Sequence, residues 1–138
     1  MSISARNLWP EDIAVTDVVA PVSIMKEQAS LLGERTKNLV EGRVTPGADS
    51  AAKVDLLLEN RFRYDFDLVA PALNNYRYRL FSILHGLNFY PLTLESAPLD
   101  SGPIQVTNEE QFLTWLEAIF SAEKTKTIIS LLIAQSRA

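Results

Sequence analysis

The stretch FRYDFDLVAPALNNYRYRLF, residues 62 to 81, decides the fold that this sequence predicts. Successive side chains of a β-strand point to opposite faces of the sheet. One face of a first strand then carries Phe62, Tyr64, Phe66 and Leu68. Asn74-Asn75 supplies turn residues, and a second strand follows from Tyr76 to about Leu84. The stretch therefore predicts an antiparallel hairpin with an aromatic face.

The opposite face of this hairpin carries Asp65, Asp67, Arg77 and Arg79. Two carboxylates on one strand face could serve as an acid/base pair or help to bind a metal. A turn centred on Ala72 instead places Asp67 opposite Arg77 and Asp65 opposite Arg79, where cross-strand ion pairs occupy both acids. We therefore favour a charged ladder that sets the register over a catalytic site.

The alternation of the second strand breaks in its later half, where Phe81 and Ile83 follow the arginines on the charged face. Either both faces are covered there, or a β-bulge re-aims the chain. A third strand is expected over YPLTLE (90–95), with Pro91 at its beginning or on a sheet edge. The following segment SAPLDSGPI (96–104) is expected to be a loop.

Helices are expected at both ends of the chain. The spacing predicts one from about Val22 to Lys37, with Gly33 weakening its end. A short strand follows over LVEGRVT (39–45), and TPGADSAAK (45–53) should be an exposed loop. Residues 53–60 are ambiguous, with a slight preference for strand. Near the C-terminus, Thr107 and Glu110 form a capping box, and the apolar pattern indicates two helices joined near Ser121.

These elements predict one α+β domain over residues 1–138, with residues 1–20 irregular. An antiparallel β-meander of about 3–5 strands would pack against an N-terminal helix and two C-terminal helices. A chain of 138 residues with 47% hydrophobic and 22% charged residues is ordinary for a globular domain.

The composition narrows the classes of function. There is no cysteine, so disulfides, thiolate metal sites and a cysteine nucleophile are excluded. The first residues lack the apolar run of a signal peptide, and IISLLIA (128–134) is shorter than the roughly 20 residues that span a bilayer. We expect a cytoplasmic protein with no membrane partner and no cofactor or metal.

The charge pattern favours a protein partner over nucleic acid. The net charge is −4, and between Arg79 and Lys124 there are six acidic residues but no lysine or arginine. Such a surface repels phosphates, although we favour a solvated acidic helix face as the explanation of this charge run. In YRYR (76–79) tyrosines and arginines point to opposite faces, so they cannot form one stacking surface for bases. The apolar C-terminal helix should bury one side, which would allow a homo-oligomer through it.

His85 is the only histidine, and the sequence around it contains no nucleophile elbow or metal-binding motif. No phosphate-binding loop or calcium-binding loop occurs elsewhere in the chain. We therefore interpret His85 as a structural residue at a strand end rather than as a catalytic base.

Two hypotheses of function remain. The first is a small non-catalytic protein-binding module, such as a regulator, an adaptor or an immunity-type inhibitor, which acts through an acidic and aromatic-rich surface. Its candidate residues are Asp65, Asp67, Arg77, Arg79, Glu109, Glu110 and Glu117. The second is a small-ligand-binding protein or minimal enzyme with an aromatic-lined pocket near His85. Its candidate residues are Tyr64, Tyr78, His85, Tyr90 and Trp115.

Overall fold

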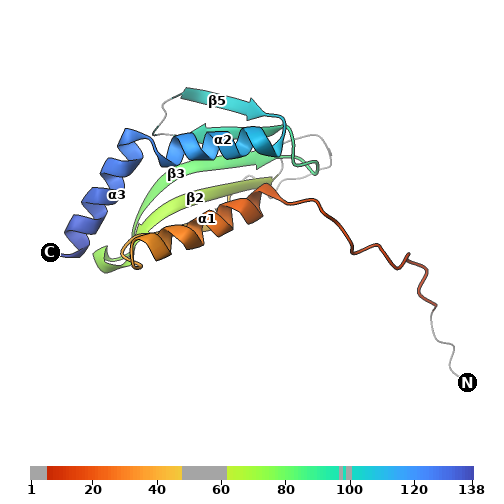
Figure 1. The fold of residues 1–138 in the computed structure, drawn as a ribbon, viewed down its shortest axis with the longest axis horizontal. Coiled ribbons are helices and arrows are strands. Elements are labelled where there is room, and N and C mark those ends of the chain that lie inside the picture. Colours follow the sequence, from red (N-terminus) through yellow and green to blue (C-terminus); the bar gives the residue numbers. More distant parts are fainter. Residues whose placement is uncertain (1–5, 48–61, 97, 99–100) are drawn as a thin grey trace, which may run out of the picture.

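The computed structural model describes residues 6–47, 62–96, 98 and 101–138 of the chain (Figure 1). An exposed arm of residues 6–20 precedes the first helix. The elements are then α1 (Pro21–Arg35), β1 (Glu41–Pro46), β2 (Phe62–Ala70), the 3-10 turn η2 (Pro71–Leu73), β3 (Tyr76–His85), β4 (Leu92–Ser96), β5 (Ser101–Val106), α2 (Glu109–Phe120) and α3 (Glu123–Ser136). This order confirms the predicted α+β fold.

The five strands form one antiparallel meander in the order β1-β2-β3-β4-β5. All three helices pack on the same side of this sheet, which we call the helix face. Its central residues are Gly42, Phe66, Leu68, Phe81, Ile83 and Leu94. The other side carries the charged residues of β2 and β3, and we call it the open face. Figure 1 shows α1 and α2 lying across the sheet and α3 turning along its end.

The hydrophobic core lies between the helix face and the helices. Phe66 stacks on Phe81 with ring centroids 5.1 Å apart, and Trp115 of α2 meets Phe81 edge-on at 5.1 Å. Phe112 and Ile119 of α2 are fully buried beside them. Aromatic residues on the strands and an apolar stripe on α2 therefore build one core.

Of the two alternatives for the later half of the second strand, the structure shows the β-bulge. Phe66 pairs with Phe81, but the next residue, Asp67, pairs with Arg79, so Leu80 is the extra residue of β3. Without the bulge, strand alternation would place Phe81 and Ile83 on the same face as Arg77 and Arg79. The extra residue moves them to the helix face. Leu80 is buried as well, so the residues that break the alternation all contribute to the core.

The predicted register of the hairpin is wrong. Asp67 lies opposite Arg79 rather than Arg77, and Asp65 lies opposite Ser82. The bulge accounts for part of the difference, and the turn accounts for the rest. Pro71–Leu73 forms a 3-10 turn before Asn74 and Asn75, both of which adopt left-handed backbone angles (φ 59° and 58°). The turn residues themselves are those expected from the sequence.

The two C-terminal helices are confirmed, and their boundary is close to Ser121 as predicted. The start of α2 is shifted by one residue from the predicted capping box. Asn108 is the N-cap, and its side chain accepts a hydrogen bond from the backbone N–H of Gln111. The Gln111 side chain in turn accepts from the backbone N–H of Thr107. Asn caps helices at least as well as Thr, so the shifted start still satisfies the backbone N–H groups of Gln111 and Thr107.

The predicted loop over residues 96–104 is wrong in its second half, where the structure has the strand β5. Residues 101–106 instead form the outer strand next to β4. Pro103 lies within this strand, and proline is tolerated on an edge because its missing N–H would face away from the sheet. The opposite edge strand, β1, has six residues and ends at Pro46.

The expected strand over 39–45 corresponds to β1, and its Gly42 and Val44 lie on the helix face. The prediction for residues 53–60 and most of the 45–53 loop lie outside the described residues. Among the residues that the structure describes, none of the helices has the length and apolar character needed to cross a bilayer.

Candidate functional site

Asp67, on the open face, is almost completely enclosed by arginines. Its side chain is 2% exposed, and its two oxygens accept hydrogen bonds from Arg77 Nη1 at 3.1 Å and from Arg79 Nε at 2.7 Å. The hydrogen bond to Asp67 also raises the pKa of Arg79 above its ordinary value. Charge-assisted hydrogen bonds of this kind are strong, and they occupy both carboxylate oxygens.

Asp65 forms the second half of this cluster. Its Oδ1 accepts from Ser82 Oγ at 2.6 Å and from Arg63 Nε at 3.1 Å, while its Oδ2 lies 3.5 Å from Arg79 Nη1. The ion pairs Asp67–Arg77 and Asp65–Arg79 that the sequence predicted therefore exist, as diagonal contacts in a shifted register. Both acids are neutralised by neighbouring arginines. Their geometry is that of a structural cluster, because no carboxylate oxygen of Asp67 is left for a substrate.

His85 lies at the end of β3 among aromatic rings. It stacks with Phe62 at 5.6 Å and with Tyr64 at 6.0 Å, and Phe89 meets it edge-on at 5.4 Å. Burial lowers the pKa of His85, although its Nδ1 lies 2.7 Å from the carbonyl oxygen of Gly86, which opposes the shift. Nδ1 must donate in that contact, which leaves Nε2 as a buried acceptor with no hydrogen-bond partner among the described residues.

The residues predicted to line an aromatic pocket do not converge on one cavity. Tyr64 and His85 are in contact, whereas Tyr78 lies seven residues from His85 along β3, roughly 23 Å at the usual strand rise. Trp115 packs on Phe81 above the middle of the sheet. The hydroxyl of Tyr90 is buried and has no hydrogen-bond partner in the part of the chain that the structure describes. Desolvation, helped by the Glu109 carboxylate, raises the pKa of Tyr90.

The three glutamates predicted to meet a partner lie on the outer side of α2 and are exposed. Glu109 and Glu110 occupy the first turn of the helix. Carboxylates at this position interact favourably with the helix dipole, which gives them a structural role whether or not a partner binds. Glu117 lies two turns further along the same helix.

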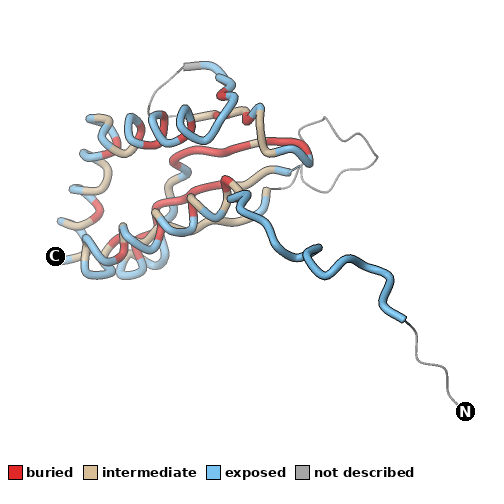
Figure 2. The backbone as a smooth tube through the Cα atoms, turned by 45° about the vertical axis from the view of Figure 1, so that its right-hand side comes forward, coloured by how far each residue is buried: buried red, intermediate tan, exposed pale blue. Residues whose placement is uncertain are grey.

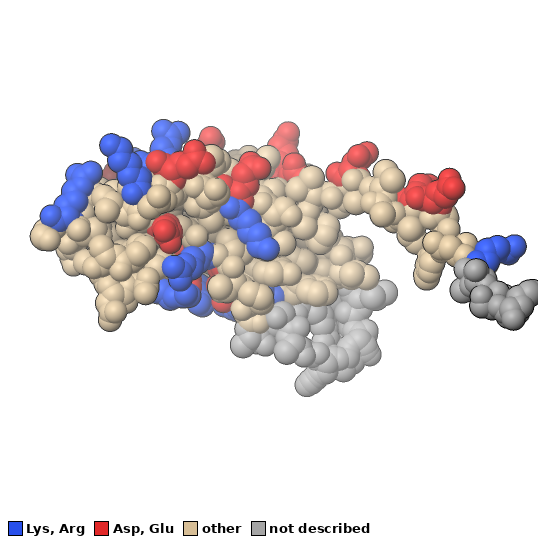
Figure 3. Space-filling view, turned by 90° about the horizontal axis from the view of Figure 1, so that it is seen from below, with Lys and Arg blue, Asp and Glu red and all other residues tan. Residues whose placement is uncertain are grey.

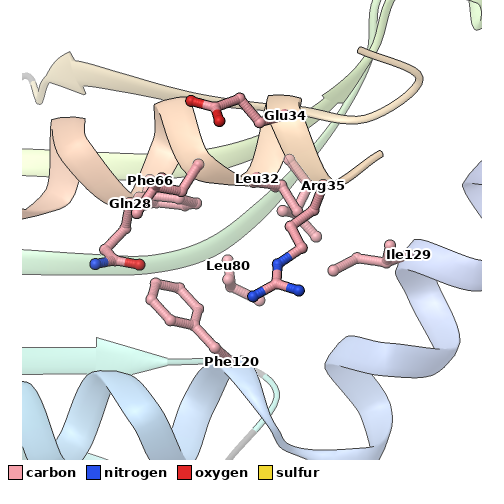
Figure 4. Close-up of a pocket in the computed structure, with 10 residues that line it drawn as sticks. Gln28, Leu32, Glu34, Arg35, Phe66, Leu80, Phe120 and Ile129 are labelled. Carbon is pink, nitrogen blue, oxygen red and sulfur yellow. The ribbon is translucent and has the colours of Figure 1, made fainter. Parts of the chain in front are cut away.

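An apolar groove lies between α1 and the α2–α3 junction on the helix side. Its volume is about 660 Å³, and its floor is formed by Phe66, Leu68, Leu80 and Phe120 (Figure 4). Its walls are Gln28, Leu31, Leu32, Glu34 and Arg35 of α1 and Ile129 of α3. We call this set the interhelix groove. A volume of this size is within the range of ligand sites, about 300–1,000 Å³.

The groove exists because α1 approaches the sheet through small residues. Met25, Ala29 and Gly33 form the buried line of α1, and a Cβ atom added to Gly42 of β1 would lie 2.8 Å from the Cα of Ala29. This close approach places α1 over β1, so the neighbouring side of the helix, which carries Leu31, faces along the sheet rather than into the core. Leu31 is 42% exposed. An apolar side chain therefore stands at the rim with much of its surface open to solvent.

The far wall of the groove depends on the break between α2 and α3. Helix α2 ends at Phe120, and Thr125 of α3 is fully buried with its hydroxyl donating to the carbonyl of Ile119 at 2.8 Å. This contact fixes the turn at which α3 leaves the direction of α2. Phe120 and Ile129 then face α1 across an opening rather than across packed side chains.

Two charged residues of α1, Glu34 and Arg35, line this groove. Figure 4 shows the Arg35 side chain reaching into the space beside Leu80 and Ile129, whereas the Glu34 side chain points away from them. The guanidinium forms no ion pair with any residue that the structure describes, in contrast to the arginines of the open face. An arginine in an apolar setting without a carboxylate partner favours an acidic group on whatever binds there.

A second apolar opening lies on the other side of α3. Its volume is about 600 Å³, and it is lined by Leu73, Tyr76, Tyr78, Lys124, Ile128, Leu131, Leu132 and Gln135. Leu132 is buried while Leu131 is 55% exposed. The expectation that the apolar C-terminal helix buries one side is met for Leu132, and association through Leu131 stays a prediction.

Sequence reasoning missed the groove itself, although helical spacing places Gln28, Leu31 and Arg35 on one side of the first helix. Residues with this spacing usually face the core, but the buried residues of α1 are Met25, Ala29 and Gly33 on a neighbouring side of the helix. The signal that could have revealed this is the pair of glycines: Gly33 in a helix and Gly42 in the following strand are suited to close packing of the two elements.

Within the described residues, no three side chains of histidine, cysteine, aspartate or glutamate are grouped so that they could hold a metal ion. No protein-family model matches the sequence, and comparisons with curated proteins and with solved structures find no match either.

Proposed function

We propose that this chain is a non-catalytic protein-binding module, and that its interhelix groove receives an apolar segment of a protein partner. The main support for the proposal is the combination of an apolar floor, an exposed apolar rim at Leu31 and a guanidinium at Arg35 that forms no ion pair with the described residues. Apolar grooves between helices are a common way to bind a peptide segment. A carboxylate of that segment would pair with Arg35.

The rest of the surface supports binding over catalysis. Asp67 is occupied by Arg77 and Arg79, and Asp65 by Arg63 and Ser82. The single histidine contacts aromatic rings rather than a nucleophile. The acidic side of α2, with Glu109, Glu110 and Glu117, is a second surface that would suit a basic partner.

A peptide-display selection on the full chain tests the proposal. The variant Leu31→Asp places a charge on the groove rim, and Leu113→Asp is the matched control, because Leu113 is 44% exposed on α2 and does not line the groove. We expect enriched peptides with apolar residues beside an acidic one, which bind wild type and Leu113→Asp alike. Binding to Leu31→Asp should be at least about tenfold weaker, a loss of about 1.4 kcal/mol. Equal binding to Leu31→Asp would contradict the groove as the site.

The small-ligand alternative near His85 has one observation in its favour. The Nε2 of His85 and the hydroxyl of Tyr90 are both buried, and no described residue forms a hydrogen bond with either. Buried polar groups without partners are uncommon in folded proteins. A thermal-shift screen of metabolites on wild type and His85→Gln tests it, since a ligand bound to the folded state raises the melting temperature. A hit that is lost in His85→Gln would support this alternative, and a screen without hits would count against it.

A further inference from the structure

The arm of residues 6–20 presents an unusual amount of apolar surface. Six large apolar side chains along it are 47–77% exposed: Leu8, Trp9, Ile13, Val15, Val18 and Val19. Figure 2 shows the arm exposed along its whole described length and extending away from the body. Single exposed apolar residues are normal, but a continuous series marks an interaction surface.

The arm has a defined local shape around its tryptophan. Trp9 donates its backbone N–H to the side chain of Asn7, and Ile13 donates its N–H to the carbonyl of Pro10. These contacts form a short turn, with the acidic pair Glu11 and Asp12 between the apolar residues Trp9 and Ile13. Figure 3 shows acidic side chains along the arm. The segment therefore combines apolar anchors with carboxylates, which is the chemistry that the interhelix groove fits.

We propose that the arm of one copy docks into the interhelix groove of a second copy, with the exchange made in both directions. Trp9 and Ile13 would contact the apolar floor, and Glu11 or Asp12 would pair with Arg35 of the other chain. This inference rests on the proposed function, because it names the occupant of the same groove.

A second copy fits better than the arm's own chain. Ala20 precedes Pro21 and is extended (φ −72°, ψ 141°), as residues before proline usually are. The arm therefore leaves the first turn of α1 away from the body (Figure 1). The groove lies at the other half of α1, from Gln28 to Arg35. The arm would have to reverse its direction to reach this groove in its own chain.

Reciprocal exchange also gives a closed assembly of sufficient size. A two-fold dimer uses both arms and both grooves, which leaves no arm free to recruit further copies. Each buried tryptophan contributes about 150–250 Å². With five further apolar side chains on each arm, the total can reach the roughly 1,200–2,000 Å² of specific interfaces.

Light scattering on the full chain over a dilution series tests the proposal. We expect wild type to have twice the 15.4 kDa chain mass. The arm variant Trp9→Ser/Ile13→Ser and the groove variant Leu31→Asp should each be folded monomers that unfold cooperatively, because all three side chains are exposed. Leu113→Asp and Leu131→Asp should remain dimers. A monomeric wild type, or a dimer that survives in either the arm or the groove variant, would overturn the proposal.

Mixing the two monomeric variants distinguishes arm exchange from association through another surface. The arm variant keeps an intact groove, and the groove variant keeps an intact arm. An equimolar mixture should therefore give a heterodimer in native mass spectrometry, weaker than the wild-type dimer because it has one of the two contacts. No heterodimer at any concentration, or loss of the dimer in Leu131→Asp, would overturn arm exchange, and the latter would indicate association through α3.

A charge reversal tests the contact with Arg35. Arg35→Glu and the double change Glu11→Lys/Asp12→Lys should each weaken the dimer, by about twofold to fivefold per contact for a partly exposed ion pair. Combining all three changes should restore most of the affinity. If the losses of dimer affinity from Arg35→Glu and from Glu11→Lys/Asp12→Lys simply add in the combined variant, Arg35 does not pair with these carboxylates.

The two proposals fail in different ways. A wild-type monomer together with displayed peptides that need Leu31 would leave the groove as a binding site and remove the arm as its occupant. A monomer whose Trp9 is shielded from quencher in wild type but accessible in Leu31→Asp would mean docking within one chain, which overturns the exchange between copies. Binding of neither peptide nor arm would remove both proposals.

Discussion

The two faces of the sheet bury their residues by different means. On the helix face, Phe66 is covered by apolar side chains and stacks on Phe81. On the open face, the next residue of the same strand, Asp67, is just as buried but is covered by the arginines of β3. Burial alone therefore does not identify a core. On the open face, ion pairs between the strands cover the buried aspartates. On the helix side, an apolar groove remains between α1 and the α2–α3 junction.

The largest expected effect of a substitution is on the helix face. Phe66→Ala should lower the free energy of unfolding by about 3–5 kcal/mol, since a fully buried aromatic ring is replaced by a cavity. Phe62→Ala is the control, because Phe62 is 36% exposed at the end of the same strand and should cost much less. Urea unfolding measures both. Equal losses would mean that the helix face has no distinct core at Phe66.

Asp67→Asn tests the open face and should cost about 1.5–3 kcal/mol, the usual range for hydrogen bonds to charged groups. The cost is less than for Phe66 because Arg77 and Arg79 are about half exposed and can be hydrated again. Glu95→Gln is the control, since Glu95 is 41% exposed and 3.7 Å from Arg63, and exposed pairs contribute about 0–1 kcal/mol. Urea unfolding at low and high salt distinguishes them, because salt should reduce the Glu95 effect and leave the Asp67 effect nearly unchanged.

Gly42→Ala should destabilise the fold by about 1–3 kcal/mol, as overpacking does. The added Cβ would lie 2.8 Å from the Cα of Ala29 and 2.9 Å from the ring of Phe66, so α1 must move away from β1. Gly102→Ala is the matched control, with nothing within 4 Å of the added atom. Thermal unfolding measures both changes. A neutral Gly42→Ala would refute the close approach that we hold responsible for the interhelix groove.

The smallest expected effect is the pH dependence from His85. Burial lowers the pKa of His85 in the folded state below the ordinary value of 6.5, so the unfolded chain binds the proton more readily. Its contribution to stability is therefore present above pH 6.5 and is lost as the pH falls below it. Stability measured between about pH 7.5 and 5.5 should fall more steeply for wild type than for His85→Gln. Equal slopes would show that His85 does not titrate differently on folding.

The sequence predicted most of the fold because its hairpin and its last two helices have strong local patterns. The alternation from Phe62 to Leu68 and the turn at Asn74-Asn75 locate β2 and β3. The register could not be predicted, because it depends on the 3-10 turn at Pro71–Leu73 and on a bulged Leu80 whose position is fixed by packing. The strand β5 was missed because Gly102 and Pro103 resemble a loop, and only its pairing with β4 makes it a strand.

The candidate site was less predictable than the fold. The interhelix groove brings together residues from α1, β2, β3, α2 and α3, and no local pattern reports a space between elements. The orientation of α1 was the decisive unknown. Apolar residues such as Leu31 suggest the core, but the backbone packs where Ala29 and Gly33 allow the closest approach. Small residues, more than large ones, determined which side of the helix was left open.

The prolines of the outer strands have a consequence for how copies of this chain can meet. Exposed strand edges can add further strands and so start cross-β aggregation. Here β5 carries Pro103 and lacks one backbone donor in its middle, and β1 is short, charged at Glu41 and Arg43, and ends at Pro46. Both borders of the sheet are thereby poor templates for another backbone. Contacts between molecules are left to side chains, which can distinguish one partner from another where a bare peptide edge cannot.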